Sequence, residues 1–318
     1  MKAAGILTMS GGALTGTAAA TEHVDNGDID GEYGDVTGGT YIETPDGVPL
    51  YYTERGEGET IVLIHGWTCD SEYWWQKNVD ALAENHHVVT YDLRGHGLSG
   101  KTDDGHTLSG YADDLDFLMG SLDIEDVTLV GWSMGVPIIL TYLERCGNRR
   151  VRAIGLVDQT PKFYSEDGWE FALLGEFSEE GLAELVGGLE SNRSETAKPI
   201  IQAFFAEPRS EERLAEMYAR TTLTPTSVAT AMLNDLVPKD FRDHLPRIDV
   251  PTLLLYGEHS AVFPGPLGEW MHEQIPDSDL VTFAESGHSP FWEEPEKFNT
   301  ELAEFVARVT DTEPPVTN

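Results

Sequence analysis

Short apolar, β-branched runs alternate with helix-like segments along the first half of the chain. Three of these runs are TIVLIHG (60–66), HVVTYDL (87–93) and VTLVGWS (127–133), and helix-like sequence at 71–84 and 107–122 separates them. Apolar strands joined by helices are typical of parallel sheets that helices cover on both faces. We therefore predict an α/β fold with a mostly parallel central sheet and helices on both faces.

The predicted sheet extends in both directions from these runs. Before them, TYIET and VPLYYTE flank the turn PDG and predict an antiparallel hairpin. After them, a helix is expected from Met134 to about Cys146. The remaining sequence predicts strands at 151–158, 251–257 and 279–285, and helices at 264–275 and from Pro295 onward.

Between about Pro161 and Leu245 the sequence predicts helices and no strand. SEERLAEMYAR is one such helix, and TSVATAMLNDL is another, with Thr224 as its N-cap and Pro225 in its first turn. About eighty residues without a strand are enough to form a lid over the edge of the sheet. The predicted organisation is a flexible N-terminal segment at 1–38, an α/β core at 39–160 and 246–311, a helical lid at 161–245 and a tail at 312–318.

The N-terminal residues 1–20 carry one Lys, a short apolar run interrupted by Thr, Ser and Gly, and an Ala-x-Ala-like end. These features make a weak signal peptide, so we expect a cytoplasmic protein, with secretion as the alternative if residues 1–20 act as a signal. Residues 21–38 are rich in Gly and Asp and are expected to be disordered. No stretch of the sequence approaches the apolar length of a membrane span.

Acidic residues dominate the charge of the chain. It has 56 Asp and Glu against 20 Lys and Arg, which gives a formal net charge of −36. Such self-repulsion destabilises a folded chain in dilute buffer, and concentrated salt screens it. We interpret the chain as a salt-adapted protein from a halophile, with an acidic mesophilic protein as the alternative. The same charge makes nucleic acid and anionic membranes poor partners.

The motif G-x-S-x-G occurs at the junction of a predicted strand and helix, as GWSMG at 131–135. Its serine, Ser133, is expected on a sharp, strained turn, where the flanking glycines let neighbouring backbone approach closely. The hydroxyl of Ser133 would then be exposed, and the N–H of Met134 would face a developing oxyanion.

A nucleophilic serine also needs a second oxyanion donor and a base. LIHGWTCD supplies a donor in the backbone N–H of Trp67, which follows His65 and Gly66. AESGHSPFWEEPEKF places His288 in a loop directly after the last predicted strand. Of the ten histidines, His288 is the one placed to take the proton of the serine.

Together these segments resemble the α/β-hydrolase superfamily over residues from about 40 to 310. The matching motifs are HGW at 65–67, YDLRGHGLS at 91–99, GWSMG at 131–135 and GHSPFWEEPEKF at 287–298. The resemblance implies that Ser133 is the nucleophile and His288 the general base. It also implies an oxyanion hole made by the N–H groups of Trp67 and Met134. Asp92 and Arg94 are expected to belong to the scaffold.

The chain departs from the family at the acid of the triad. The usual position is three residues past the Gly of LLLYG, and Ser260 occupies it. Some relatives, including certain haloalkane dehalogenases and lipases, take the acid from the strand after the nucleophile helix. That strand here is AIGLVD, which ends at Asp158. We favour Asp158 as the orienting acid, with Glu258 as the alternative. A purely structural alternative for Asp158 is a turn cap that bonds the N–H of Thr160.

A serine at the elbow predicts acyl transfer, so the favoured function is hydrolysis of small-molecule carboxylic esters. The alternatives are a carbon–carbon bond hydrolase acting on diketones, a cofactor-free perhydrolase, and a non-enzymatic, lid-gated small-molecule sensor. No metal or nucleotide motif appears, so no cofactor is expected, and the oligomeric state stays open. Cys69 and Cys146 match no metal or redox spacing and are expected to be unpaired core thiols.

Tryptophans adjoin several of these residues. Trp132 and Trp292 neighbour Ser133 and His288, and Trp169 lies in the predicted lid. All three are expected in the substrate pocket, with core or lid packing as the alternative. The Trp that follows His-Gly also resembles the same position in arylesterases and perhydrolases of this superfamily. This resemblance favours esters with small, apolar or aromatic acyl groups as substrates.

Overall fold

The computed structural model describes residues 38–263 and 265–311, and its centre is an eight-stranded sheet. The strand order is β1-β2-β4-β3-β5-β6-β7-β8; β1 and β2 run antiparallel to their neighbours, and the remaining pairs are parallel. The predicted hairpin and the mostly parallel sheet are thereby confirmed. The strands are β1 (Thr40–Glu43), β2 (Pro49–Arg55), β3 (Glu59–Ile64), β4 (His86–Tyr91), β5 (Val127–Trp132), β6 (Val151–Val157), β7 (Thr252–Gly257) and β8 (Ser278–Phe283).

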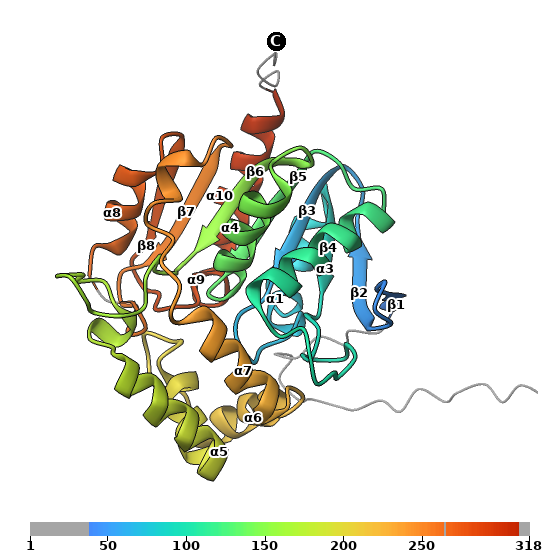
Figure 1. The fold of residues 1–318 in the computed structure, drawn as a ribbon. Coiled ribbons are helices and arrows are strands. Elements are labelled where there is room, and N and C mark those ends of the chain that lie inside the picture. The colour runs from blue at the N-terminus through green and yellow to red at the C-terminus, as the bar shows by residue number, and fades with distance from the viewer. Residues whose placement is uncertain (1–37, 264, 312–318) are drawn as a thin grey trace, which may run out of the picture. The chain divides into compact units, whose positions relative to one another are not determined.

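Helices cover both faces of this sheet (Figure 1). The helices α3 (Leu108–Ser121) and α4 (Gly135–Cys146) pack side by side in front of it, and α10 (Pro295–Asp311) passes behind it. Around α10 lie two short helices, α2 (Val79–Leu82) and α9 (Pro290–Glu293). The remaining helices of the core are α1 (Glu72–Trp75), α8 (Leu267–Gln274) and the 3₁₀ turn η2 (Leu245–Arg247).

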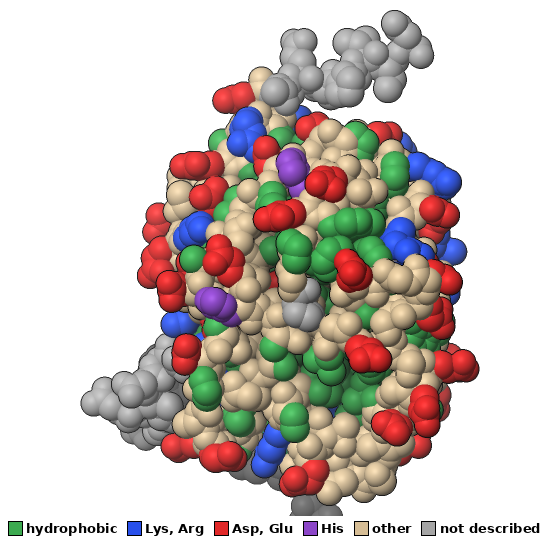
Figure 2. All heavy atoms as spheres, turned by 90° about the vertical axis from the view of Figure 1, so that its left-hand side faces the viewer, with side chains coloured by type: hydrophobic (Ala, Val, Ile, Leu, Met, Phe, Trp, Pro, Cys, Tyr) green, Lys and Arg blue, Asp and Glu red, His purple; other side chains and the backbone are tan. Residues whose placement is uncertain are grey.

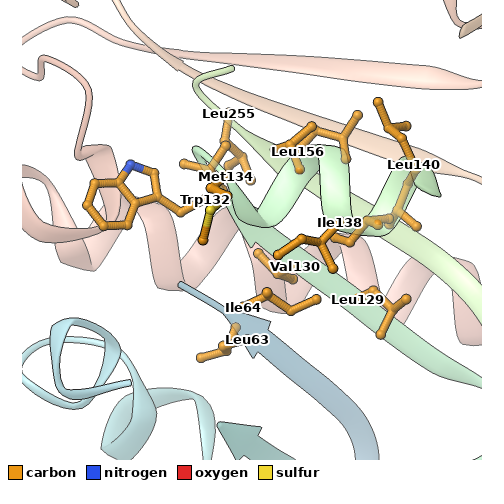
Figure 3. Packing of buried hydrophobic residues seen from close by; sticks show 14 of the residues in the cluster. Leu63, Ile64, Leu129, Val130, Trp132, Met134, Ile138, Leu140, Leu156 and Leu255 are labelled. Carbon is orange, nitrogen blue, oxygen red and sulfur yellow. The ribbon is translucent and has the colours of Figure 1, made fainter. Parts of the chain in front are cut away.

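The hydrophobic core includes the contact between the central strands and α4. Leu129 from β5 and Ile138 from α4 belong to this core and are fully buried, and so is Val130, whose side chain points to the opposite face of the sheet (Figure 3). Burying such side chains contributes about 1.5–3 kcal/mol each relative to full exposure. Trp132 ends β5 and Met134 is the N-cap of α4, and both are fully buried, so the core fixes the segment that carries Ser133.

The segment between β6 and β7, hereafter the inserted segment (161–245), is largely helical, and none of the strands of the described sheet comes from it. Its helices are α5 (Glu179–Gln202), α6 (Glu211–Thr221) and α7 (Thr226–Leu236), preceded by the 3₁₀ turn η1 (Leu173–Gly175). These three helices gather at one end of the sheet, at the bottom of Figure 1. An isolated β-bridge joins Lys162 to Asp240 near its two ends.

Some local predictions were wrong. The segment 71–84 forms two short helices, because the backbone leaves the helical conformation at Asn78, where φ is −120°. The side chain of Asn78 donates its Nδ2 to the carbonyl of Phe291 at 2.9 Å. The N-cap of α7 is Pro225 with extended backbone, so the Thr224 hydroxyl does not cap it. Cys146 ends α4 and is exposed, whereas Cys69 is buried as expected.

The predictions for residues 1–37 and 312–318, including the signal-peptide alternative, lie outside the described residues. Within the described ranges, no helix is both long enough and apolar enough to cross a membrane.

Candidate active site

Ser133 occupies the turn between β5 and α4 with a φ of 53°, a conformation that L-residues seldom adopt. The two glycines of the motif permit this turn. A Cβ atom on Gly131 would lie 2.4 Å from the backbone carbon of Gly135, and one on Gly135 would lie 2.5 Å from the carbonyl oxygen of Ile64. Both distances are far below van der Waals contact, so each position accepts only glycine without displacing backbone. The motif therefore makes the strained elbow that the sequence predicts.

Asp158 and His288 are in direct contact. Nδ1 of His288 lies 2.8 Å from Oδ1 of Asp158, and both residues are 0% exposed. Their positions come from different elements, because Asp158 directly follows β6 and His288 lies in the loop after β8. The indole N–H of Trp132 donates to the His288 carbonyl at 2.7 Å, which ties the histidine loop to the elbow.

This contact determines which ring nitrogen of His288 is available. A carboxylate only accepts hydrogen bonds, so Nδ1 must carry the proton that it shares with Asp158. Nε2 then has its lone pair free, and it has no hydrogen-bond partner among the described residues. Ser133 and His288 line the same cavity. The arrangement leaves an unprotonated nitrogen on a residue that lines the same cavity as Ser133, as a general base for this serine requires.

The carboxylate of Asp158 has two further donors. The Ser260 hydroxyl donates to Oδ1 at 2.8 Å, and the backbone N–H of Gly257 donates to Oδ2 at 3.2 Å. The alternative acid, Glu258, is exposed. The turn-cap alternative for Asp158 is contradicted, because the N–H of Thr160 donates to the Gln159 side chain. Sequence reasoning had noted Ser260 only as the residue in the place of the usual acid.

The loop after β3 approaches the elbow closely. A Cβ atom on Gly66 would lie 3.2 Å from the Cβ of Ser133. The backbone N–H groups of Trp67 and Met134 donate no hydrogen bond to any residue in the described ranges. These two groups are therefore available to a ligand atom near Ser133. The side chain of Trp67 is held from the other side, since its indole N–H donates to the Ala229 carbonyl in α7 at 2.9 Å.

His65 braces this loop from within the core. Its Nε2 accepts from the N–H of Leu93 at 3.0 Å, and its Nδ1 lies 2.9 Å from the carbonyl of Gly66. The first contact requires an unprotonated Nε2 and the second a protonated Nδ1, so the ring is neutral. Burial lowers the pKa of His65, which favours the same state. A neutral His65 thus fixes the residue that precedes Trp67.

Glu293 holds the histidine loop and was missed by sequence reasoning. Its carboxylate accepts from the N–H of Gly287 at 2.7 Å and from the N–H of Ala206 at 3.0 Å. Burial raises its pKa. Arg209 lies 3.2 Å from the same carboxylate. The acidic pair in FWEEP is the signal in the sequence that could have indicated it.

The residues expected in the scaffold are placed there. Oδ1 of Asp92 accepts from the N–H of Ser71 at 2.8 Å, and Oδ2 accepts from the N–H of Leu98 at 2.6 Å. Arg94 pairs with Asp114 and Asp46. The described ranges contain no group of three or more His, Cys, Asp or Glu side chains that could hold a metal ion.

A cavity of about 490 Å³ opens over Ser133. Most of its lining side chains are apolar, and many come from the inserted segment. Trp132 lines the cavity as expected, whereas Trp169 and Trp292 are not among the described lining residues. The lining residues are Trp67, Trp132, Ser133, Met134, Gln159, Phe163, Leu173, Leu174, Phe177, Gly181, Glu184, Leu185, Pro199, Ile200, Ala203, Phe204, Leu233, Leu236, Val262, Phe263 and His288.

The two absent tryptophans pack elsewhere. The indole N–H of Trp169 donates to the carbonyl of Lys162 at 2.8 Å, and its ring packs on Trp270. Trp292 packs edge-to-face against Phe205, and its indole N–H donates to Gln76 at 2.9 Å. The prediction for Trp292 relied on its closeness to His288 in the sequence. It was wrong because Trp292 lies on α9, which turns its side chain away from His288.

Comparison with known proteins places the chain among hydrolases. The AB hydrolase superfamily protein YisY of Bacillus subtilis is 29% identical over 269 residues, covering 84% of this chain and 98% of its own. A non-heme chloroperoxidase of Kitasatospora aureofaciens is 28% identical over 276 residues, covering 83% and 98%. Among solved structures, an esterase from Exiguobacterium antarcticum superposes with a TM-score of 0.78 at 30% identity, covering 85% and 99%. The family model described as the alpha/beta hydrolase fold matches residues 59–295, and the chain therefore belongs to that family.

Proposed function

We propose that this protein hydrolyses carboxylic esters through an acyl-enzyme on Ser133. The observation that supports it most is the 2.8 Å contact between His288 and Asp158, which leaves Nε2 of His288 without a partner beside a cavity that Ser133 also lines. The similarity to a solved esterase agrees with this reading.

In the proposed reaction, Nε2 of His288 takes the proton of Ser133 as the hydroxyl oxygen attacks the ester carbonyl. The N–H groups of Trp67 and Met134 stabilise the resulting oxyanion. His288 then gives its proton to the leaving alcohol. Water, deprotonated by the same nitrogen, releases the acid and restores Ser133. Asp158 remains ionised throughout and stabilises the transient imidazolium.

The test is hydrolysis of p-nitrophenyl acetate and butyrate in molar KCl by the wild type and by Ser133→Ala. We expect turnover by the wild type and its loss in the variant, with unchanged circular dichroism. Turnover that survives in Ser133→Ala would reject the proposal. A folded wild type that turns over no member of a panel of esters and diketones would favour the sensor alternative, and turnover of diketones alone would favour the carbon–carbon bond hydrolase.

The acid is tested by two matched amide substitutions. Asp158→Asn should lower kcat by roughly 10³- to 10⁴-fold, because the amide favours the wrong tautomer of His288. Glu258→Gln changes an exposed carboxylate in the same way and should keep most of the activity. The reverse result would transfer the role to Glu258.

Perhydrolysis is the second candidate, and the similarity to a non-heme chloroperoxidase favours it. Hydrogen peroxide would replace water in the second step, so that its oxygen attacks the acyl-enzyme, the Ser133 ester bond breaks and a peracid leaves. Peracid formation from an ester and hydrogen peroxide, lost in Ser133→Ala, tests this activity. Hydrolysis without any peracid would exclude it.

The inserted segment is proposed to act as the lid of this site. It supplies more than half of the cavity-lining residues, including Leu185, Phe204 and Leu236. It is also fastened to the core at the site itself, through the bond from Trp67 to Ala229 and the bond from Ala206 to Glu293. The inserted segment lines the pocket and contacts both the loop that carries Trp67 and the helix α9 that follows the His288 loop. Such a segment is suited to control substrate access.

Salt adaptation is proposed for the surface. Acidic side chains are spread over the face shown in Figure 2 and outnumber Lys and Arg there, while hydrophobic side chains gather near its middle. With a formal net charge of −36, the folded state carries self-repulsion that salt would screen.

A further inference from the structure

Among the described residues, two polar side chains line the cavity besides Ser133 and His288, and they are Gln159 and Glu184. Glu184 is exposed, whereas Gln159 is only 1% exposed. The indole nitrogens of the lining residues Trp67 and Trp132 are already bonded to backbone carbonyls. A buried amide in an otherwise apolar wall therefore stands out as the group to which a ligand could bond.

The orientation of the Gln159 amide follows from its neighbour. The N–H of Thr160 donates to Oε1 of Gln159 at 2.8 Å, and a donor needs the carbonyl oxygen opposite it. Nε2 is consequently the other terminal atom, and it donates to no residue in the described ranges. The backbone of Gln159 is also held in place, since the Tyr256 hydroxyl donates to the backbone carbonyl of Gln159 at 2.7 Å.

Gln159 lies close in the sequence to residues of the proposed triad. It directly follows Asp158, which bonds His288, and the N–H of Ser133 donates to the carbonyl of Val157 at 3.0 Å. Gln159 is thus next in sequence to the proposed acid and two residues from the carbonyl that bonds Ser133. Nε2 of Gln159 is not among the fully buried atoms without a partner, so it can be reached from the cavity that Gln159 lines. A bound molecule that covers this donor without offering an acceptor would leave it unpaired, at a cost of about 1–3 kcal/mol.

We propose that Nε2 of Gln159 recognises an acceptor oxygen on the substrate, so that the preferred esters carry a carbonyl oxygen besides the scissile group on an otherwise apolar, uncharged chain. This inference rests on the proposed esterase function and names its substrate class. The apolar lining of the cavity favours an apolar substrate chain, and Gln159 favours a substrate that carries the additional oxygen. An ester that lacks this oxygen binds in the same cavity but leaves the amide unpaired.

The experiment compares kcat/KM for matched esters. One arm varies the acyl group, with p-nitrophenyl pentanoate against its 3-oxo and 4-oxo analogues. The other arm varies the alcohol, with butyl pentanoate against 2-oxobutyl and 3-oxobutyl pentanoate. The wild type should prefer at least one oxo ester about tenfold or more over its parent, after correction for the chemical reactivity of each ester. The arm that shows the preference identifies the side that Gln159 contacts.

Gln159→Met keeps the length of the side chain and removes the donor, so it should abolish the oxo preference while the parent ester is still hydrolysed. Gln159→Glu retains an acceptor for the Thr160 N–H and also removes the donor, so it should lose the preference too. Gln274→Met is the matched control, because Gln274 lies in α8 and is not among the described cavity-lining residues. A preference ratio is informative because a merely structural defect would lower both rates together.

Two kinds of failure remain distinct. If the wild type hydrolyses the parent esters but shows no oxo preference, or if Gln159→Met keeps the preference, this inference is wrong and the esterase proposal stands. If the wild type hydrolyses none of the esters, the proposed function fails and the inference fails with it.

Discussion

The hydroxyl of Ser260 donates a 2.8 Å hydrogen bond to Oδ1 of Asp158, the same oxygen that contacts His288. Ser260 stands three residues past Gly257, where the family usually carries its acid. The two alternative positions for the acid are therefore side by side in this protein. Position 260, where the family usually has its acid, here carries a serine that donates a hydrogen bond to the carboxylate of Asp158.

This proximity predicts that the acid can be moved. Asp158→Asn alone should lose roughly 10³-fold or more in kcat, because His288 loses its orienting carboxylate. Adding Ser260→Asp to it restores a carboxylate next to the ring, and we expect at least tenfold recovery over the single variant. Ester hydrolysis by the three proteins measures this. A double variant no more active than Asp158→Asn would show that position 260 cannot replace position 158.

The hydrogen bond itself is tested by Ser260→Ala. A hydrogen bond to a charged group contributes about 1.5–3 kcal/mol, so kcat/KM should fall about tenfold if that bond orients the carboxylate. Ser260→Thr keeps the hydroxyl and should lie closer to the wild type. Equal activity of Ser260→Ala and the wild type would mean that the N–H of Gly257 suffices to hold Asp158.

Glu293 is expected to position His288 without touching the substrate. Its two carboxylate oxygens accept from Gly287 and Ala206, and an amide can accept at only one of them. Glu293→Gln should therefore lower kcat about tenfold, with KM changed less. Glu296→Gln, on the first turn of α10, is a control for loss of a nearby charge. Loss of activity that merely follows lower thermal stability would argue against positioning.

Much of this site could be predicted from the sequence because its chemistry is local. The elbow needs glycines on both sides of Ser133, and a histidine must follow the last strand, so both are visible in short motifs. Asp158 could be inferred because the usual position holds Ser260. The roles of Glu293 and Gln159 depend on contacts between distant segments, and no pattern of neighbouring residues encodes them. The pocket prediction for Trp292 failed because its side chain contacts Gln76 and Phe205, which are distant in the sequence.

Asp70 predicts a specific pH dependence of stability. Burial, helped by the charge of Asp92, raises the pKa of Asp70 to about 6 from an ordinary value of 3.8, although Arg220 at 2.8 Å opposes the shift. A raised pKa means that the folded state binds the proton more tightly than the unfolded state. The contribution of Asp70 to the free energy of unfolding is therefore largest below about pH 4 and is lost as the pH rises through about 6.

Asp70→Asn removes this titration, so its unfolding free energy should vary less with pH between about 4 and 6 than that of the wild type. Urea unfolding at a series of pH values in constant KCl provides the measurement. Arg220→Gln, on α6, removes the opposing cation and should move the pH-dependent loss to higher pH. Parallel curves for the wild type and Asp70→Asn would contradict the assignment to Asp70.

The surface charge predicts a dependence of folding on salt. The screening length falls from about 10 Å at 0.1 M to about 3 Å at 1 M salt, so repulsion among exposed carboxylates is largely removed in molar KCl. We expect the Tm to rise by well over 10 °C between 0.1 and 2 M KCl. Ordinary salting-out would also raise the Tm, so the increment must be shown to depend on charge.

A variant that neutralises exposed acids outside the described ion pairs separates these two effects. The substitutions are Glu84→Gln, Asp103→Asn, Glu190→Gln and Glu273→Gln, all at exposed positions. This variant should be more stable than the wild type at 0.1 M KCl and gain less from added salt, because fewer carboxylates repel one another. If it gains as much from KCl as the wild type does, the stabilisation comes from salting-out, and the acidic surface has another cause. If the wild type keeps its Tm and activity at 0.1 M KCl, it is not salt-adapted.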